Sequence, residues 1–172
     1  VILLLIQVGG MGVVTIAVAI FMFAGKRIGL KQRWVMQESI SAPQVGGIVR
    51  MTGFILKTAF LIEGVGVLLL ALRFCPQFGL GRGLWYAVFH SVSAFCNAGF
   101  DLMGVNSPFS SLTDYVGDPL VSNVIAFLII IGGVGFLTWN DIREHKLHFR
   151  RYRLQSKLIL STTLALLLGA FL

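Results

Sequence analysis

The sequence predicts an all-α membrane protein built from repeats of two spanning helices with a re-entrant segment between them. Hydrophobic residues make up 56% of the 172 residues and charged residues only 12%, about half the charged fraction of a typical soluble domain. Several stretches approach the length of about 20 apolar residues that crosses a bilayer. A three-glycine pattern also occurs twice along the chain. Together these observations indicate a chain that folds in lipid.

Four apolar stretches are expected to form spanning helices or parts of them. They are residues 1–23, 51–72, 120–139 and 158–172. The second stretch contains Lys57 and Glu63. A carboxylate is costly at membrane depth and therefore marks Glu63 as a candidate functional residue. Lys57 lies six positions away, which is off the spacing that would pair the two on one helix face.

Residues 84–101 have the length of a helix but too many polar groups to cross a bilayer as one. The stretch includes His90, Ser93 and Asn97. Irregular backbone at membrane depth is tolerated only where it is buried in protein or lines a water-filled cavity. The segment is therefore interpreted as a re-entrant pore loop, and it indicates a path for ions through the membrane.

The basic residues predict how the chain is oriented. The connections 24–49 and 141–157, counted with the adjoining Arg50, hold eleven of the 14 Lys and Arg residues. Both connections are expected to be cytoplasmic, so the chain between them must cross the membrane an even number of times. Two apolar helices already supply two crossings. Residues 84–101 should therefore enter from the outer side and return to it.

An internal repeat places these stretches in a larger design. The same glycine pattern occurs in residues 6–12 and, 123 positions later, in residues 129–135. We therefore expect a fragment of a longer protein, with residues 1–23 as the second helix of repeat 1, 50–140 as repeat 2, and 158–172 as the start of repeat 3. Small residues let membrane helices approach closely. The glycines expected to serve this packing are Gly9, Gly10, Gly12, Gly132, Gly133 and Gly135.

The re-entrant segment can be interpreted residue by residue. Its first part is expected to form a short pore helix whose negative dipole end faces the membrane centre and favours a cation. The chain then returns through Asn97, Ala98, Gly99 and Phe100, whose backbone carbonyls can replace the water shell of an ion. Asp101 follows at the outer mouth, where it would concentrate cations. His90 and Ser93 are expected to support the pore helix by hydrogen bonds.

These motifs resemble a known family. Residues 89–102 resemble the second pore loop of the Trk/Ktr/HKT superfamily of potassium transporters, and four further motifs look closest to its Ktr branch. They are residues 7–12, 25–30, 37–39 and 132–136. The resemblance covers essentially the whole chain. It implies four repeats in one polypeptide around a single pore, with a glycine in each filter strand.

The resemblance also implies a function and partners. It implies selective potassium uptake, often sodium-dependent in the Ktr branch, by a multi-pass protein of the bacterial inner membrane. The implied partners are membrane lipids, a second copy in a homodimer, and a cytosolic ring of nucleotide-binding regulatory subunits, with no nucleic acid. The sequence contains no catalytic constellation, phosphate-cradling loop or metal-ligand spacing. We therefore expect no enzyme and no covalent cofactor, with potassium as the only metal and sodium as a candidate activator.

The sequence leaves two hypotheses from other classes open. A secondary transporter with a midplane substrate site would require unwound backbone at Gly9-Gly10 and Gly132-Gly133. A membrane anchor without transport would leave the polar segment at residues 84–101 without a purpose. The pore hypothesis instead requires helices at both glycine pairs and unwound backbone at residues 97–100.

Overall fold

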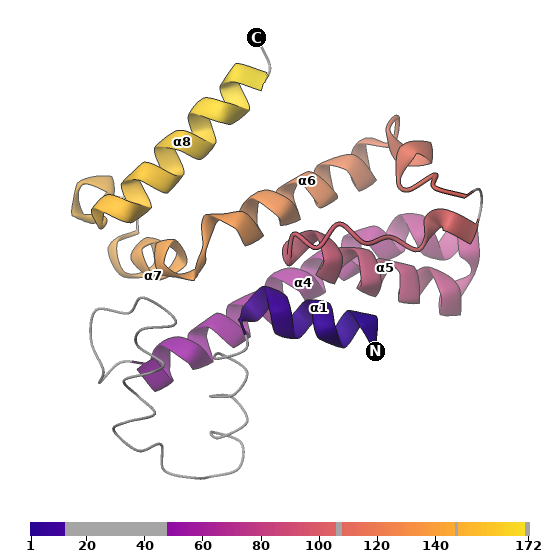
Figure 1. Cartoon of the computed structure of the whole chain (residues 1–172), viewed down its shortest axis with the longest axis horizontal. Helices are drawn as coiled ribbons and strands as arrows, with labels where there is room; N and C mark the ends of the chain where they lie inside the picture. The colour runs from indigo at the N-terminus through magenta and orange to yellow at the C-terminus, as the bar shows by residue number, and fades with distance from the viewer. Residues whose placement is uncertain (13–47, 106–107, 147, 171–172) are drawn as a thin grey trace. The chain divides into compact units, whose positions relative to one another are not determined.

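The computed structural model describes residues 1–12, 48–105, 108–146 and 148–170, and in these ranges it contains six α-helices and no β-strand (Figure 1). The chain divides into two compact units, residues 1–133 and 134–172. An all-α fold is therefore confirmed for the described residues.

Helix α1 (Ile2–Met11) is short and uncharged, and Gly12 follows it with a φ of +80°. Gly9 and Gly10 lie inside this helix. The remainder of the stretch expected over residues 1–23, and residues 24–47 of the expected cytoplasmic connection, lie outside the described residues.

Helix α4 (Ile48–Phe78) is longer than the helix expected over residues 51–72. Hydropathy alone ends that stretch before Arg73, but the guanidinium of Arg73 pairs with Asp118 at 2.5 Å. The charge is thereby compensated, and the helix continues to Phe78. Residues 52–78 form the one described unbroken helix that is long and apolar enough to cross a membrane.

Helix α5 (Leu80–Phe95) begins before residue 84, where the sequence placed its start. The expected start at residue 84 lies just after Gly83, but Gly83 is itself inside α5 and packs against α4. A Cβ atom at Gly83 would lie 2.5–2.7 Å from backbone atoms of Phe74 and Cys75. The missing side chain of Gly83 therefore allows the close contact between α4 and α5 (Figure 1).

The helix expected over residues 120–139 is interrupted, which corrects that prediction. Helix α6 (Pro119–Val134) ends before Gly135, and helix α7 (Phe136–His145) begins after it. Gly135 has a φ of +83°, a left-handed conformation that cannot continue a right-handed α-helix. Hydropathy did not reveal this break because no polar residue marks it.

The second unit contains α7 and helix α8 (Leu154–Ala170). The basic connection expected over residues 141–157 is therefore partly helical, since α7 ends within it and α8 begins within it. A short 3-10 turn, Phe149–Arg151, lies between the two helices. The apolar stretch expected from residue 158 is part of α8, which starts at Leu154.

The core of the first unit surrounds Phe74, a fully buried residue of α4. Its ring contacts the rings of Phe78, His90 and Tyr115, with centroids 5.4–6.2 Å apart. Met103 belongs to the same buried cluster. These buried side chains form one core shared by α4, α5 and the segment that leads to α6.

Candidate functional site

The candidate site lies where the chain after α5 turns back, beside the middle of α4. The hydroxyl of Ser91 in α5 donates a hydrogen bond of 2.7 Å to the carbonyl of Glu63, which lies midway along α4. After α5 ends at Phe95, the chain returns until Met103 packs near Leu70 and Phe74 in the C-terminal half of α4. Residues 80–103 thus run to about half the length of α4 and back.

The turning point is not helical. Asn97 and Gly99 have φ angles of +54° and +72°. Such left-handed angles are natural for glycine and tolerated by asparagine. Asn97, Gly99 and Phe100 are exposed in this structure. The residues expected to form a filter strand therefore present an irregular backbone on the surface of the unit.

Ser93 holds both ends of this strand. Its backbone carbonyl accepts a hydrogen bond of 2.9 Å from the N–H of Ala98. Its hydroxyl donates a hydrogen bond of 2.6 Å to the carbonyl of Phe100. Ser93 itself is buried, 3% exposed, and its two bonds fix the strand to the last turn of α5. The carbonyl of Phe100 is thus already engaged on one side by a hydroxyl.

His90 supports the C-terminal end of the strand. Its Nδ1 atom lies 2.7 Å from the carbonyl of Tyr86, and the N–H of Leu102 points at its Nε2 atom from 3.4 Å. The tautomer with its proton on Nδ1 satisfies both contacts, since a carbonyl can only accept and an amide N–H can only donate. The ring lies between α5 and the returning chain.

Asn97 joins the strand to α6. Its side-chain amide points at the carbonyls of Phe95 and Ile129 from 3.4 Å each. Gly132, one turn further along α6, lies so close to Phe95 that a Cβ atom would overlap the carbonyl oxygen. A larger residue at position 132 would push α6 away from the turning point.

Asp101 and a cavity lie beside the strand. The Asp101 carboxylate accepts a hydrogen bond of 2.9 Å from the N–H of Met103. A cavity of about 250 Å³ is lined by the strand residues Asn97, Gly99 and Asp101, by the α5 residue Ser93, and by aliphatic residues of α6 such as Ile125. The lining residues thus include carboxylate, amide and hydroxyl side chains, around a space large enough to hold water.

The six predicted packing glycines behave in three ways. Gly10 and Gly132 make close approaches, to Cys96 and to Phe95 respectively. Gly9 has open space around its missing Cβ, and Gly133 has only the Asn97 side chain, 4.0 Å away. Gly12 and Gly135 follow the helices, with φ angles of +80° and +83°.

The two glycine pairs are themselves helical. The broken-helix hypothesis required Gly9-Gly10 and Gly132-Gly133 to be unwound, and that expectation is wrong. The helices end at the third glycine of each motif instead. Because Gly12 and Gly135 share the same backbone conformation, the two copies of the motif are alike in local structure as well as in sequence.

Glu63 forms hydrogen bonds with a residue that the sequence did not suggest. Its carboxylate accepts hydrogen bonds of 2.8 and 3.0 Å from the side-chain amide of Gln7 in α1. The Cys96 thiol lies 4.0 Å from the same carboxylate. Glu63 and Gln7 are separated by 56 positions, so no spacing rule along one helix could have paired them.

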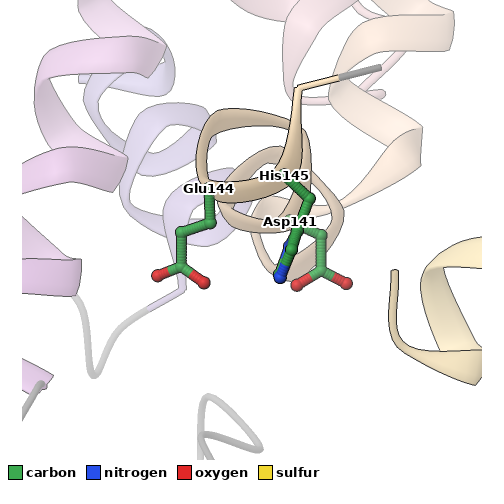
Figure 2. Close-up of side chains that lie close together, drawn as sticks. All are labelled: Asp141, Glu144 and His145. Atoms are coloured by element: carbon green, nitrogen blue, oxygen red, sulfur yellow. The ribbon is translucent and has the colours of Figure 1, made fainter. Parts of the chain in front are cut away.

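A second polar group, in α7, was not among the predicted site residues. Asp141, Glu144 and His145 bring ligand-type atoms within 4.8 Å of one another, and Figure 2 shows their side chains leaving α7 on one side. Their spacing of three and four positions was the available signal. Asp141 is fully buried, and its carboxylate accepts hydrogen bonds of 2.6 Å from the hydroxyl of Ser156 and of 3.0 Å from the backbone N–H of Arg153. The guanidinium of Arg153 lies 3.4 Å away. We therefore assign Asp141 a structural role between α7 and α8.

The segment between α5 and α6 carries a charged clamp. Asp118 pairs with Arg73, and its other oxygen accepts hydrogen bonds from the backbone N–H groups of Leu120 and Val121 at the start of α6. The hydrogen bond from Arg73, followed by those from the backbone, lowers the pKa of Asp118 below its usual value. Burial raises the pKa of the neighbouring Tyr115.

Comparison with known proteins gives a consistent result. The model of the TrkH family, described as cation transport protein, matches residues 2–168. The Ktr system potassium uptake protein B of Bacillus subtilis strain 168 is 43% identical over 162 residues, which cover 94% of this chain and 35% of the relative. The potassium/sodium uptake protein NtpJ of Enterococcus hirae is 39% identical over 170 residues, covering 99% of this chain and 36% of that relative.

A third relative extends the comparison. The Ktr system potassium uptake protein B of Vibrio alginolyticus is 35% identical over 170 residues, which cover 98% of this chain and 36% of the relative. The chain therefore spans about a third of the length of the relatives it matches.

Proposed function

Because the chain belongs to the TrkH family of cation transport proteins, we propose that it forms part of a potassium uptake pore in which residues 97–100 are a filter strand. In this proposal the carbonyls of Asn97, Ala98 and Gly99 bind the ion. The carbonyl of Phe100 also binds the ion, while the hydroxyl of Ser93 holds that carbonyl in place. Asp101 lies at the mouth. The observation that carries the proposal is the exposed irregular backbone beside the middle of a membrane-spanning helix.

Exposed backbone at membrane depth is stable only in a few environments. Unpaired N–H and C=O groups are unstable against lipid, so this face must meet water or more protein. A filter uses such groups, since carbonyl oxygens can replace the hydration shell of an ion. The bonds from Ser93 and Asn97 hold the strand from the side of α5 and α6. The exposed face remains open to an ion path.

The names of the relatives support potassium as the ion. Two of them are potassium uptake proteins B of Ktr systems, and the third is a potassium/sodium uptake protein. We extend the proposal to sodium as an activator, to a homodimer, and to a cytosolic nucleotide-binding regulatory ring. We also propose the bacterial inner membrane as the location, with residues 24–49 and 141–157 on the cytoplasmic side.

The test is growth and cation uptake by potassium-transport-deficient bacteria that carry the full-length parent protein. We compare the parent with Gly99→Ser, using Gly104→Ser as a matched control. A Cβ atom meets nothing within 4 Å at either site, but only Gly99 has a positive φ. Left-handed backbone costs a non-glycine residue about 1–2 kcal/mol. We expect Gly99→Ser to relieve this strain by moving the neighbouring carbonyls, which should weaken potassium preference over sodium, by about tenfold if the whole cost appears in ion binding.

The control should keep the selectivity of the parent. If Gly99→Ser assembles in the membrane and selects potassium as the parent does, the filter assignment is wrong. If the parent itself fails to restore growth in low potassium, with and without added sodium, the proposal of potassium uptake fails as a whole.

A further inference from the structure

We propose that Glu63 is a positioning residue for the filter strand, because its carboxylate links α1 to the inner end of the pore segment. The inference rests on the proposed function for its readout. Its structural part concerns only three segments of the first unit, namely α1, the middle of α4, and the end of α5 with Cys96.

The link to α1 is geometrically complete. Both oxygens of Glu63 accept the amide of Gln7, and the carboxylate is buried, with the residue 4% exposed. A buried carboxylate is expensive unless its oxygens are bonded. The two bonds from one amide therefore restrain the side chain of Glu63 and hold α1 at a defined height along α4.

The link to the pore segment uses both the backbone and the side chain of Glu63. Its carbonyl accepts the hydroxyl of Ser91, which is fully buried in α5. Its carboxylate lies 4.0 Å from the thiol of Cys96, the residue that caps α5. Gly10 of α1 also packs against Cys96, and a Cβ atom at Gly10 would overlap the sulfur.

Cys96 directly precedes the strand in the chain, so the position of Cys96 affects the position of the proposed ion ligands. A shift of α1 or of the Glu63 side chain would move Cys96, and with it the carbonyls that begin at Asn97. The carboxylate acts through these neighbours. Both of its oxygens already contact the Gln7 amide, which makes Glu63 a positioning residue and the backbone of the strand the ion ligand.

The second copy of the glycine motif lacks this link. The position that corresponds to Gln7 in the repeat is Ile130, whose side chain cannot donate a hydrogen bond. The buried polar pair is therefore specific to the contact between α1 and α4. A single buried polar contact can fix the register of packed helices in this way.

The experiment uses the full-length parent in potassium-transport-deficient bacteria. Four single variants are compared, namely Glu63→Ala, Gln7→Ala, Glu63→Gln, and Lys57→Gln as an exposed single-charge control on the same helix. The half-saturation constant and maximal rate of rubidium uptake are measured together with inhibition by potassium and sodium, on protein quantified in the membrane.

Glu63→Gln keeps an oxygen that accepts the Gln7 amide and should retain potassium-over-sodium preference within about twofold. Glu63→Ala and Gln7→Ala each remove the link and should lower that preference about tenfold, the scale of one lost buried hydrogen bond. A fifth variant combines Glu63→Ala with Gln7→Ala. Its potassium-over-sodium preference should be no lower than that of the more impaired single variant, because both changes remove the same interaction. Lys57→Gln should resemble the parent.

A second readout does not depend on transport. In purified protein, the rate at which a small maleimide modifies the half-buried Cys96 is followed by mass spectrometry of its peptide. Gln7→Ala should raise this rate, while Lys57→Gln should not. Should Glu63→Ala fail to assemble, Gln7→Ala and this readout still decide the question.

Two results would overturn the inference. One is unchanged selectivity and unchanged Cys96 modification in Gln7→Ala and Glu63→Ala. The other is a Glu63→Gln variant as impaired as Glu63→Ala, because then the charge and not the link would matter. A parent without potassium uptake would instead contradict the proposed function, and the modification rates would still test the link.

Discussion

Single polar side chains determine the path of the chain at the turning point. Ser93 binds the strand at two places, and Asn97 accepts a left-handed backbone angle while its amide reaches toward α6. The sequence indicated His90 and Ser93 as supports of the pore helix. The structure places both against the returning strand, where they fix the chain that follows the helix.

At the residue scale, the clamp between Arg73 and Asp118 predicts sensitivity to acid. The pKa of Asp118 is lower in the folded protein than in the unfolded chain. Its stabilising contribution is therefore present above the usual carboxyl pKa and is lost as the pH falls through the lower, folded-state value. Asp118→Asn should lower the thermal unfolding temperature at pH 7 and lose less stability than the parent below about pH 4.

The measurement is intrinsic fluorescence of the detergent-purified parent and variant during heating, at pH values from 7 to 3. Asp114→Asn is the matched control, since Asp114 is an exposed carboxylate of the same segment. An Asp118→Asn variant with the acid response of the parent would show that the clamp contributes nothing measurable.

At the scale of the helices, glycine positions decide how closely the elements approach. Gly83 brings α5 against α4, and Gly132 brings α6 against the end of α5. In a membrane, packing of this kind replaces the hydrophobic driving force between helices. Hydropathy could locate each helix but not its distance from the next, because close approach depends on which side of the helix carries the glycine.

This packing predicts different effects for two glycine substitutions. Gly132→Ala would place a methyl group on the carbonyl of Phe95, a backbone atom that cannot rotate away, and should destabilise the protein by about 1–3 kcal/mol. Gly81→Ala in α5 meets nothing within 4 Å and should be neutral or stabilising by up to about 1 kcal/mol, since alanine favours a helix.

Unfolding of the purified full-length variants in increasing SDS compares the two substitutions directly. Equal stability of Gly132→Ala and the parent would mean that α6 does not lie against Phe95. A loss in Gly81→Ala as large as in Gly132→Ala would mean that any added methyl group harms these helices.

At the scale of the whole molecule, the basic residues predict how the chain lies across the membrane. The segment between α5 and α6 and the region of Phe149–Arg151 should face opposite sides. We expect a cysteine at exposed Phe109 to react with a membrane-impermeant maleimide in intact cells. A cysteine at exposed Arg150 should react only after the cells are permeabilised.

Cys75→Ser and Cys96→Ala provide the background for this labelling experiment, and blocking of any remaining thiols with a permeant reagent provides the baseline. Labelling of both positions in intact cells, or of neither, would contradict the orientation.

The sequence by itself determined the class of the protein and the approximate location of its spanning helices. Apolar length and the distribution of basic residues are local properties that a bilayer selects directly. For the same reason residues 84–101 stood out, because their polarity is incompatible with an ordinary span. The motif at Asn97–Gly99 also suggested which residues turn the chain.

Only the tertiary structure decided where helices end and which polar groups meet. The helix expected over residues 120–139 stops at Gly135 through its backbone angle, and α4 continues past Arg73 because Asp118 compensates the charge. Glu63 meets Gln7 across 56 positions. These outcomes depend on how separate segments approach one another, and that distance is set by packing that no periodicity within a single segment encodes.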